Sequence, residues 1–297
     1  MIAKASADWA RSFLLGETAM RDFRDKVAVI TGAGSGIGRA LAKALAARGA
    51  HLALSDIDEA GLAESARMLA GSSTKVTTQR LDVAVRADVE AHAERVVAEH
   101  GRVNLVFNNA GVGLESRISE MSSEDLEWLM GINFWGVVYG TKAFLPHLKA
   151  SGDGHVINIS SVFGIIAVPG QASYNAAKFA VRGYTEALRQ ELEVEGWPVS
   201  ATCVHPGGIK TNIARNSRMP NVKPGQPSRE ELLDQFDLAA RTTPERCAEI
   251  ILRAVERNRR RVLVGADAKI IDLVQRLFPT GYQRLLVWGT RRRERSQ

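Results

Sequence analysis

The 297-residue sequence has few cysteines, no long apolar run and little net charge outside its last residues. Its two cysteines, Cys203 and Cys247, are far apart and in no metal-ligand spacing, so we expect neither a disulfide framework nor a metal site. No apolar run approaches the ~20 residues that a membrane-spanning helix needs. The amino-terminal residues lack the apolar core and cleavage site of a signal peptide, and we therefore expect a cytoplasmic protein.

Most of the positive charge lies at the carboxyl terminus. The formal net charge is +6, of which residues 284–297 contribute +4 through five arginines and one glutamate. The rest of the chain is nearly neutral, whereas binding to nucleic-acid phosphates requires a basic face on the fold itself. We therefore expect no nucleic-acid partner.

Short β-branched runs alternate with amphipathic runs of helical length along most of the chain. Strands are expected at 26–31, 51–56, 75–83, 103–111, 155–160 and 199–207, with helices between them, the first two at 36–49 and 59–71. This alternation is typical of an α/β protein with a doubly wound parallel sheet, the Rossmann fold.

The chain reads as a single domain with an extension at each end. No linker divides residues 26–266, which we expect to hold both the dinucleotide site and the catalytic site. Residues 1–25 form an amino-terminal extension, and residues 267–297 an amphipathic, arginine-rich extension with extra helices. The polar, proline-bearing segment 212–242 follows a strand end, where a lid over a ligand site is expected.

A glycine-rich turn, TGAGSGIG at 31–38, joins the first strand to the first helix. Such glycines let the backbone approach a pyrophosphate, and the helix amino terminus offers N–H groups to it. A glycine trio alone is weak evidence, but its position between strand and helix strengthens it. Asp56 closes the second strand, where an acid would bond the adenosine ribose and repel a 2′-phosphate. The pattern favours NAD over NADP; the alternative is that Asp56 caps the next helix, a role that Asp58 could also fill.

Tyr174 and Lys178 stand four residues apart in QASYNAAKF, residues 171–179, and so share one helix face. A phenol with a pKa of about 10 must lose ~2–3 units, about 3–4 kcal/mol, to act as a base near neutral pH. An ammonium at ~5 Å supplies about 3.3 kcal/mol at an effective dielectric near 20, but about 0.8 kcal/mol in water. The pair therefore suits a tyrosine base only where water is excluded. The alternative is an exposed tyrosine beside a solvated lysine.

Seven motifs occur in a fixed order along the chain: TGAGSGIG, Asp82 in LDV, NNAG (108–111), Asn133 in INFWG, NISS (158–161), Tyr174-x-x-x-Lys178 and PGGIKT (206–211). With them the sequence closely resembles the short-chain dehydrogenase/reductase family from about Lys26 to Gly265. The resemblance implies an NAD(P)-dependent oxidoreductase that transfers hydride between the coenzyme and a secondary alcohol or ketone.

The resemblance also implies a catalytic set of Asn133, Ser161, Tyr174 and Lys178. Tyr174 would exchange a proton with the substrate oxygen, which Ser161 would hold. Lys178 would bind the nicotinamide ribose, and Asn133 would anchor a water in the proton path. Ser161 is preferred to Ser160 because of its spacing to the tyrosine. The implied cofactor-binding residues are Gly32, Ser35, Gly36, Ile37, Gly38, Asp56, Asp82, Val83, Asn109, Ala110, Gly111, Tyr174, Lys178, Pro206, Gly207, Ile209 and Thr211.

Mostly apolar residues flank these motifs and favour an apolar alcohol or ketone as the small-molecule substrate: Val112, Leu114, Phe163, Ile165, Val168, Pro169 and Met219. Two alternatives stay open. One is an NADP-dependent carbonyl reductase of the same family, and the other is a non-catalytic dinucleotide sensor on the same fold.

Two segments bear on protein or membrane partners. In this family the helix that follows the tyrosine commonly meets its copy, so its small apolar stripe implies a homodimer or homotetramer; the alternative is packing on its own sheet. The stripe consists of Ala176, Ala177, Ala180, Val181, Leu188 and Leu192. The basic amphipathic carboxyl terminus could lie on an anionic membrane surface, but docking on its own or a neighbouring subunit is favoured.

Overall fold

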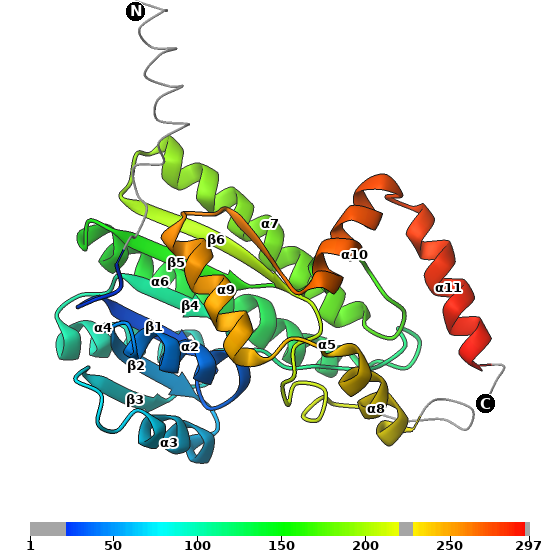
Figure 1. Cartoon of the computed structure of the whole chain (residues 1–297), viewed down its shortest axis with the longest axis horizontal. Helices are drawn as coiled ribbons and strands as arrows, with labels where there is room; N and C mark the ends of the chain where they lie inside the picture. The colour runs from blue at the N-terminus through cyan, green and yellow to red at the C-terminus, as the bar shows by residue number, and fades with distance from the viewer. Residues whose placement is uncertain (1–21, 220–227, 295–297) are drawn as a thin grey trace, which may run out of the picture.

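The computed structural model describes residues 22–219 and 228–294. At its centre is a parallel seven-stranded sheet in the order β3-β2-β1-β4-β5-β6-β7, covered by helices (Figure 1). The strands are β1 (Val27–Thr31), β2 (His51–Asp56), β3 (Val76–Arg80), β4 (Leu105–Asn108), β5 (Gly154–Ile159), β6 (Val199–Pro206) and β7 (Arg261–Val264). The expected doubly wound α/β fold is confirmed.

The helices connect successive strands and continue beyond the last one. They are α2 (Gly36–Ala46), α3 (Glu59–Met68), α4 (Arg86–His100), α5 (Ser123–Met130), the π-helix η1 (Gly131–Trp135), α6 (Gly136–Ala150), the 3₁₀ helix η2 (Val162–Gly164), α7 (Ala172–Val194), α8 (Arg229–Ala239), α9 (Pro244–Glu256), α10 (Ala266–Leu277) and α11 (Gly281–Glu294). None of these helices is long and apolar enough to cross a membrane.

Both faces of the sheet are buried, which explains why its central strands are continuous apolar runs. Buried side chains of α2 and α9 pack on one face, and those of α4, α6 and α7 on the other. The strand order reverses between β1 and β4, the point at which ligands bind in such sheets. The carboxyl ends of β1, β2, β4, β5 and β6 therefore define where the site lies.

The structure extends the expected body at both ends. Phe23, assigned to the amino-terminal extension, is 2% exposed in the core beside α2, with the Arg48 guanidinium 5.6 Å from its ring centroid. Ala268, assigned to the carboxyl-terminal extension, is fully buried. Both residues are apolar and lie close to the predicted boundaries, so the core extends slightly beyond residues 26–266. The expected extension over residues 1–21 lies outside the described residues.

One strand was missed. β7 is only four residues long, and it lies directly after the basic run Arg257 to Arg260. Its pairing with β6, from Cys203↔Arg261 to Pro206↔Val264, makes it a strand. Short edge strands gain their structure from a neighbour, so the local sequence carries little signal for them.

A chain of buried polar side chains crosses the middle of the sheet. Asn108 Nδ2 on β4 donates to Asn158 Oδ1 on β5 at 2.8 Å and to Thr141 Oγ1 on α6 at 3.1 Å. Asn158 Nδ2 donates in turn to Thr185 Oγ1 on α7 at 3.0 Å. We call these four residues the amide ladder. It satisfies two amides that would otherwise be costly to bury, and it ties α6 and α7 to the two central strands.

Candidate active site

The glycine turn after β1 adopts a conformation that side chains do not permit. Gly32 and Gly36 have φ of +66° and +50°, where glycine is strongly favoured. A Cβ on Gly38 would lie 2.1 Å from the Gly32 carbonyl oxygen. Ser35 caps α2 with extended backbone, and its side chain is exposed and bonds no backbone N–H of the described chain. Ile37 follows within the first turn of α2. The turn therefore exposes the helix amino terminus, as a bound pyrophosphate requires.

The NNAG segment after β4 packs directly on this turn. The backbone N–H groups of Asn109 and Ala110 both donate to Thr31 Oγ1 at 3.0 Å. Asn109 Nδ2 donates to the carbonyls of Thr31 at 2.9 Å and Gly32 at 3.2 Å. A Cβ on Gly32 would be 2.8 Å from Ala110 Cα. Thr31, which the sequence analysis did not select, thus joins the ends of β1 and β4.

Asp56 turns towards the glycine turn and does not cap α3. Its Oδ2 accepts from the Gly34 N–H at 2.8 Å, and its Oδ1 from the Asp58 N–H at 3.0 Å. Asp58 is the cap, because its carboxylate accepts from the Gly61 N–H at 3.1 Å. The alternative reading of Asp56 as a helix cap is therefore wrong.

Arg39 is a cation near Asp56 that the sequence analysis missed. It follows Gly38 in α2, and its Nε donates to Ser65 Oγ at 2.9 Å. Its Nη2 donates to the Gly61 carbonyl at 3.1 Å and to the Gly34 carbonyl. These bonds hold the guanidinium between the glycine turn and α3.

Asp82 and Val83 lie just beyond β3. The Leu81 N–H donates to the Asp56 carbonyl at 3.0 Å, which brings this segment beside the end of β2. Asp82 Oδ1 accepts from the Ala84 N–H at 2.9 Å, and Val83 is 8% exposed. The pair thus forms an ordered, partly apolar wall next to Asp56.

The PGG turn after β6 is held by a residue from the carboxyl-terminal extension. Asp267 Oδ2, at the start of α10, accepts from the Gly208 N–H at 2.6 Å. A Cβ on Gly207, directly after Pro206, would lie 2.0 Å from the same oxygen. Asp267 was not selected because the resemblance ends before it, yet its carboxylate fixes this turn.

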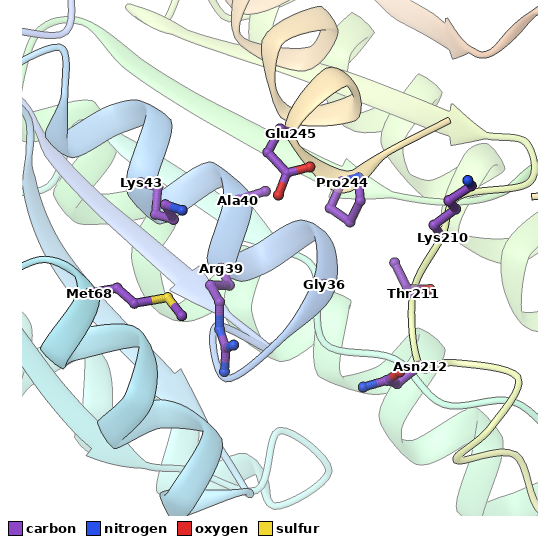
Figure 2. A pocket seen from close by; sticks show the side chains of 10 residues that line it. All are labelled: Gly36, Arg39, Ala40, Lys43, Met68, Lys210, Thr211, Asn212, Pro244 and Glu245. Carbon is purple, nitrogen blue, oxygen red and sulfur yellow. The ribbon is translucent and has the colours of Figure 1, made fainter. Parts of the chain in front are cut away.

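Ile209 and Thr211 continue the PGG turn towards the glycine turn. Ile209 is 4% exposed, and a Cβ on Gly36 would be 3.1 Å from Thr211 Cγ2. An open cavity of about 270 Å³ lies beside them, between α2, the segment 210–212 and the start of α9 (Figure 2). Its lining residues are Gly36, Arg39, Ala40, Lys43, Met68, Lys210, Thr211, Asn212, Pro244 and Glu245.

Tyr174, Lys178 and Ser161 meet at the carboxyl end of β5. Lys178 is 3% exposed, and its Nζ donates to the Ile159 carbonyl at 3.0 Å. This Nζ lies 5.5 Å from the centroid of the Tyr174 ring, and the Tyr174 phenol hydrogen bonds with the Ser161 hydroxyl. The expected i, i+4 pair therefore lies on one face of α7, with Lys178 buried and Tyr174 half-buried.

The pKa of Tyr174 shifts in the direction opposite to the expected one. Burial raises the pKa of Tyr174 to about 12, although the Ser161 hydrogen bond acts in the opposite direction. Burial also lowers the pKa of Lys178 to about 8. The predicted fall in the tyrosine pKa is not produced by the protein alone. The site that excludes water around the ammonium also removes water from the phenolate, and the second effect is the larger.

Asn133 is fully buried in the π-helix η1, an element often found at functional sites. Its Oδ1 accepts from the Val112 N–H, and its Nδ2 donates to the Val112 carbonyl, both at 2.8 Å. A Cβ on Gly111 would lie 3.3 Å from Asn133 Oδ1 and 3.6 Å from Lys178 Nζ. The end of NNAG is thus the point where the catalytic candidates adjoin the dinucleotide candidates.

The two serines of NISS have different surroundings. Ser160 Oγ is 2.8 Å from the Lys178 carbonyl, to which it donates, and the residue is 2% exposed. Ser161 Oγ accepts from the Phe163 N–H at 3.1 Å and reaches Tyr174. Its carbonyl accepts from His205 Nδ1 at 2.9 Å. The geometry supports the choice of Ser161, and it adds His205, which no motif indicated.

The surroundings of Tyr174 are mainly apolar, with one half-buried acid, Glu115. The Phe163 ring meets the Tyr174 ring edge to face, with centroids 6.1 Å apart, and Leu114 and Ile165 are buried. Glu115 pairs with the Gln171 side chain, and burial raises the pKa of its carboxyl. The sequence analysis expected a mostly apolar substrate region and did not select Glu115.

The first part of the expected lid is tied to the segment that follows NNAG. The Arg218 N–H donates to the Gly113 carbonyl at 3.1 Å, and the Arg218 carbonyl accepts from the Glu115 N–H at 3.0 Å. The Arg218 guanidinium lies 3.6 Å from the Trp128 ring centroid and bonds Asp125 at 3.1 Å. In the rest of the expected lid, α8 is largely exposed, and residues 220–227 lie outside the described residues.

Comparison with known proteins shows the family of the chain. The family model described as short chain dehydrogenase matches residues 26–221. A Mycobacterium tuberculosis protein named "Putative oxidoreductase SadH" is 52% identical over 271 residues, which cover 91% of this chain and 97% of SadH. The chain belongs to the short-chain dehydrogenase/reductase family of oxidoreductases.

Solved structures of the same family share the fold. A short-chain dehydrogenase/reductase from Burkholderia phymatum, in complex with NAD, has a TM-score of 0.79 and 33% identity over 87% of this chain and 95% of its own. An alcohol dehydrogenase from Thermococcus sibiricus, complexed with 5-hydroxy-NADP, has a TM-score of 0.66 and 29% identity over 81% and 95% of the two chains. These relatives thus include complexes with both types of coenzyme.

Proposed function

We propose that this protein is an NAD-dependent dehydrogenase that transfers hydride between the coenzyme and an apolar secondary alcohol or ketone. The observation that carries the proposal is the convergence of Tyr174, Lys178 and Ser161 beside Gly111, at the edge of the glycine turn. A hydroxyl donor, a phenol and a cation are the groups needed to hold and protonate a substrate oxygen.

Tyr174 is the proposed proton-transfer group, with Ser161 holding the substrate oxygen. Lys178 lies between the Ile159 carbonyl and Gly111, which suits a bond from its ammonium to a ribose hydroxyl. Burial raises the pKa of Tyr174 to about 12, so further positive charge near the phenol would favour its action as a base near neutral pH. Bound NAD supplies the hydride acceptor and the positive charge of its oxidised nicotinamide.

Asn133 is proposed to act mainly through position. Its side chain bonds both backbone groups of Val112, so it holds the end of NNAG next to Lys178. The proposal keeps a water molecule in the proton path. Asn133 would bind this water through the remaining hydrogen-bonding positions of its side-chain amide or through its backbone.

The preference for NAD over NADP rests on two side chains. Asp56 places a carboxylate beside the glycine turn, where it would repel a 2′-phosphate. Arg39 is a candidate to offset this charge, but its Nε and Nη2 are engaged by Ser65, Gly34 and Gly61. The competing candidate is an NADP-dependent carbonyl reductase, as the NADP-type complex of the Thermococcus relative illustrates.

Assembly as a homodimer or homotetramer is part of the same proposal. Ala177, Val181, Leu188 and Leu192 of the α7 stripe are buried within the chain, as the alternative reading expected. Ala176 is exposed, and Phe179 and Trp135 are 40% and 46% exposed on α7 and the adjoining η1. These side chains could contact another subunit.

The test replaces Tyr174 by Phe and follows NADH absorbance with a panel of secondary alcohols, with NAD and NADP in parallel. We expect Tyr174→Phe to lower turnover by at least about 10²-fold, as loss of a general acid–base group does, while NADH still binds. Tyr184→Phe, on the same helix, is the matched control and should retain turnover. Unchanged turnover in Tyr174→Phe would refute the catalytic assignment, and faster turnover with NADP would refute the reading of Asp56. A sensor would bind NADH but turn over no substrate.

A further inference from the structure

The carboxyl-terminal helices α10 and α11 carry large apolar side chains on their exposed sides. On α10, Ile270, Leu273 and Leu277 are 62%, 56% and 63% exposed and follow the i, i+3, i+7 spacing of one helix face. On α11, Leu285 and Trp288 are 66% and 60% exposed and stand three residues apart. The full set, here called the tail face, is Ile270, Leu273, Leu277, Phe278, Leu285, Val287 and Trp288. Apolar clusters of this kind on a soluble domain mark a contact surface.

The tail face does not pack on its own subunit. Tyr282 is the one buried residue among those of α11 whose side chains the structure describes, and α11 stands away from the sheet (Figure 1). The inward side of α10 instead holds Ala268 and Asp272, which are buried. Docking on its own or a neighbouring subunit was favoured from the sequence; the tail docks on its own subunit through Ala268, Asp272 and Tyr282, but not through the tail face, and docking on a neighbouring subunit stays a prediction. The amphipathic pattern is real, but α10 turns its polar residue Asp272 inward to pair with Arg261 of β7.

The charges around the tail face are mainly positive. Between residues 266 and 292 there are five cations, Lys269, Arg276, Arg284, Arg291 and Arg292, and two acids. Asp267 is engaged by the Gly208 N–H, and Asp272 by Arg261 and Arg276. The acids thus face the body, whereas the charge next to the exposed apolar side chains is cationic. Arg292 lies over the Trp288 ring at 5.4 Å.

We propose that the tail face binds the surface of an anionic phospholipid membrane, with the apolar side chains in the headgroup region and the arginines on lipid phosphates. Apolar and basic residues interleaved on short helices are the pattern of interfacial helices. With 12 and 14 residues, α10 and α11 lie on a bilayer and do not cross it. Trp288 and Phe278 suit the interface, where aromatic side chains are enriched.

A second copy of the chain fits this surface less well. A twofold contact pairs a face with itself, and would therefore bring the same cations together. An anionic surface instead complements them, each cation near it being worth about fivefold in affinity, or about 1 kcal/mol.

The helix α11 also contacts the loop that leads to Tyr174. Tyr282 Oη accepts from the Ala167 N–H at 3.2 Å, in the loop between η2 and α7. The same loop lies between Ser161 and Tyr174 in the sequence. Binding through α11 would therefore place the loop before Tyr174 near the membrane, where apolar molecules partition.

The experiment is flotation of the full chain with vesicles, which requires no turnover and is independent of the proposed catalytic residues. Pure phosphatidylcholine vesicles are compared with vesicles that also contain phosphatidylglycerol, at about 0.1 M and about 0.5 M salt. The variants are Leu273→Ser/Leu277→Ser, Leu285→Ser/Trp288→Ser and Arg284→Gln/Arg291→Gln. Val194→Ser and Ile118→Ser remove apolar side chains that are 87% and 76% exposed elsewhere, and serve as matched controls. Circular dichroism and light scattering report the folding and subunit number of each variant.

We expect the wild type and both controls to float with the anionic vesicles, and less so at high salt. The two serine double variants should bind at least about tenfold more weakly, and the arginine double variant about 25-fold more weakly. Failure of the wild type to float, or equal flotation with both kinds of vesicle, would overturn the proposal. A change of subunit number in folded serine variants whose vesicle binding is intact would instead identify the tail face as a subunit interface.

Discussion

His205 offers a sharp test of how the site is held together. It is fully buried at the end of β6, and its Nδ1 lies 2.9 Å from the Ser161 carbonyl oxygen. A carbonyl only accepts, so Nδ1 carries the proton. Nε2 has no hydrogen-bond partner among the described residues, and burial lowers the pKa of the imidazole to about 4. The ring is therefore neutral above about pH 5 and acts as a fixed donor.

The perturbation is a pair of substitutions, His205→Leu and His205→Asn. Leu removes the donor, whereas Asn can offer an N–H near the position of Nδ1. The Ser161 carbonyl also accepts from the Gly164 N–H at 2.9 Å, so it keeps one partner in the Leu variant. A lost hydrogen bond costs about 0.5–1.5 kcal/mol, and more if a buried group is left unsatisfied. Since about 1.4 kcal/mol is tenfold in rate, we expect kcat to fall about tenfold in His205→Leu.

The assay is kcat at saturating NAD, with NADH binding and urea unfolding measured on the same samples. NADH affinity should change little, because His205 acts on Ser161 and Ser161 is assigned to the substrate. Asn should recover most of the loss in kcat. Full activity in His205→Leu, or equal losses of kcat in the two variants, would refute the positioning role of the Nδ1 donor.

Three further outcomes follow from buried polar groups. Asp267→Asn should weaken NADH binding about tenfold, because a charged acceptor of a backbone N–H is replaced by a neutral one; Asp272→Asn is the control, and equal affinities would contradict this. Burial lowers the pKa of His92 to about 4 and that of His155 to about 3, so the unfolded chain takes up protons first as the pH falls below 6.5. Each of these histidines should lower the free energy of unfolding at pH 5 by about 2 kcal/mol relative to pH 7. The midpoint of urea unfolding should therefore fall as the pH falls, and it should fall less steeply in His92→Leu. Glu115→Gln should raise Tm more at pH 8 than at pH 5, since burial raises the pKa of this carboxyl and its ionised form opposes folding; a larger gain at pH 5 would show that the sign is wrong.

The fold was predictable because its signal is local. Apolar strands, helical periodicity and strand-end motifs can each be recognised in a short stretch of sequence. Together they predict the sheet and the edge at which its strands end. β7 was not predictable in this way, since pairing with β6 creates it. The surroundings of α10 were also missed, because Asp272 is buried only through its partner on β7.

The candidate site was predictable only as far as its motifs reach. The residues that hold the motifs in place, Thr31, His205 and Asp267, make their key bonds to positions 44–79 residues away. Such bonds depend on the order of the strands in the sheet, and they give no recognisable motif in the sequence. The sign of the Tyr174 pKa shift was missed for a related reason: spacing shows a cation nearby, but it does not show the cost of burying the phenolate.

The amide ladder fixes the orientation of α7 relative to the sheet. Thr185 ends the ladder on α7, and Ser160 bonds the Lys178 carbonyl of the same helix. Rolling α7 about its axis would break both anchors, so Tyr174 keeps its orientation relative to β4 and β5. Differences in substrate shape must then be absorbed by the segments around Glu115 and Ala167. Directed changes of substrate range should therefore concentrate on those loops and leave the helix untouched.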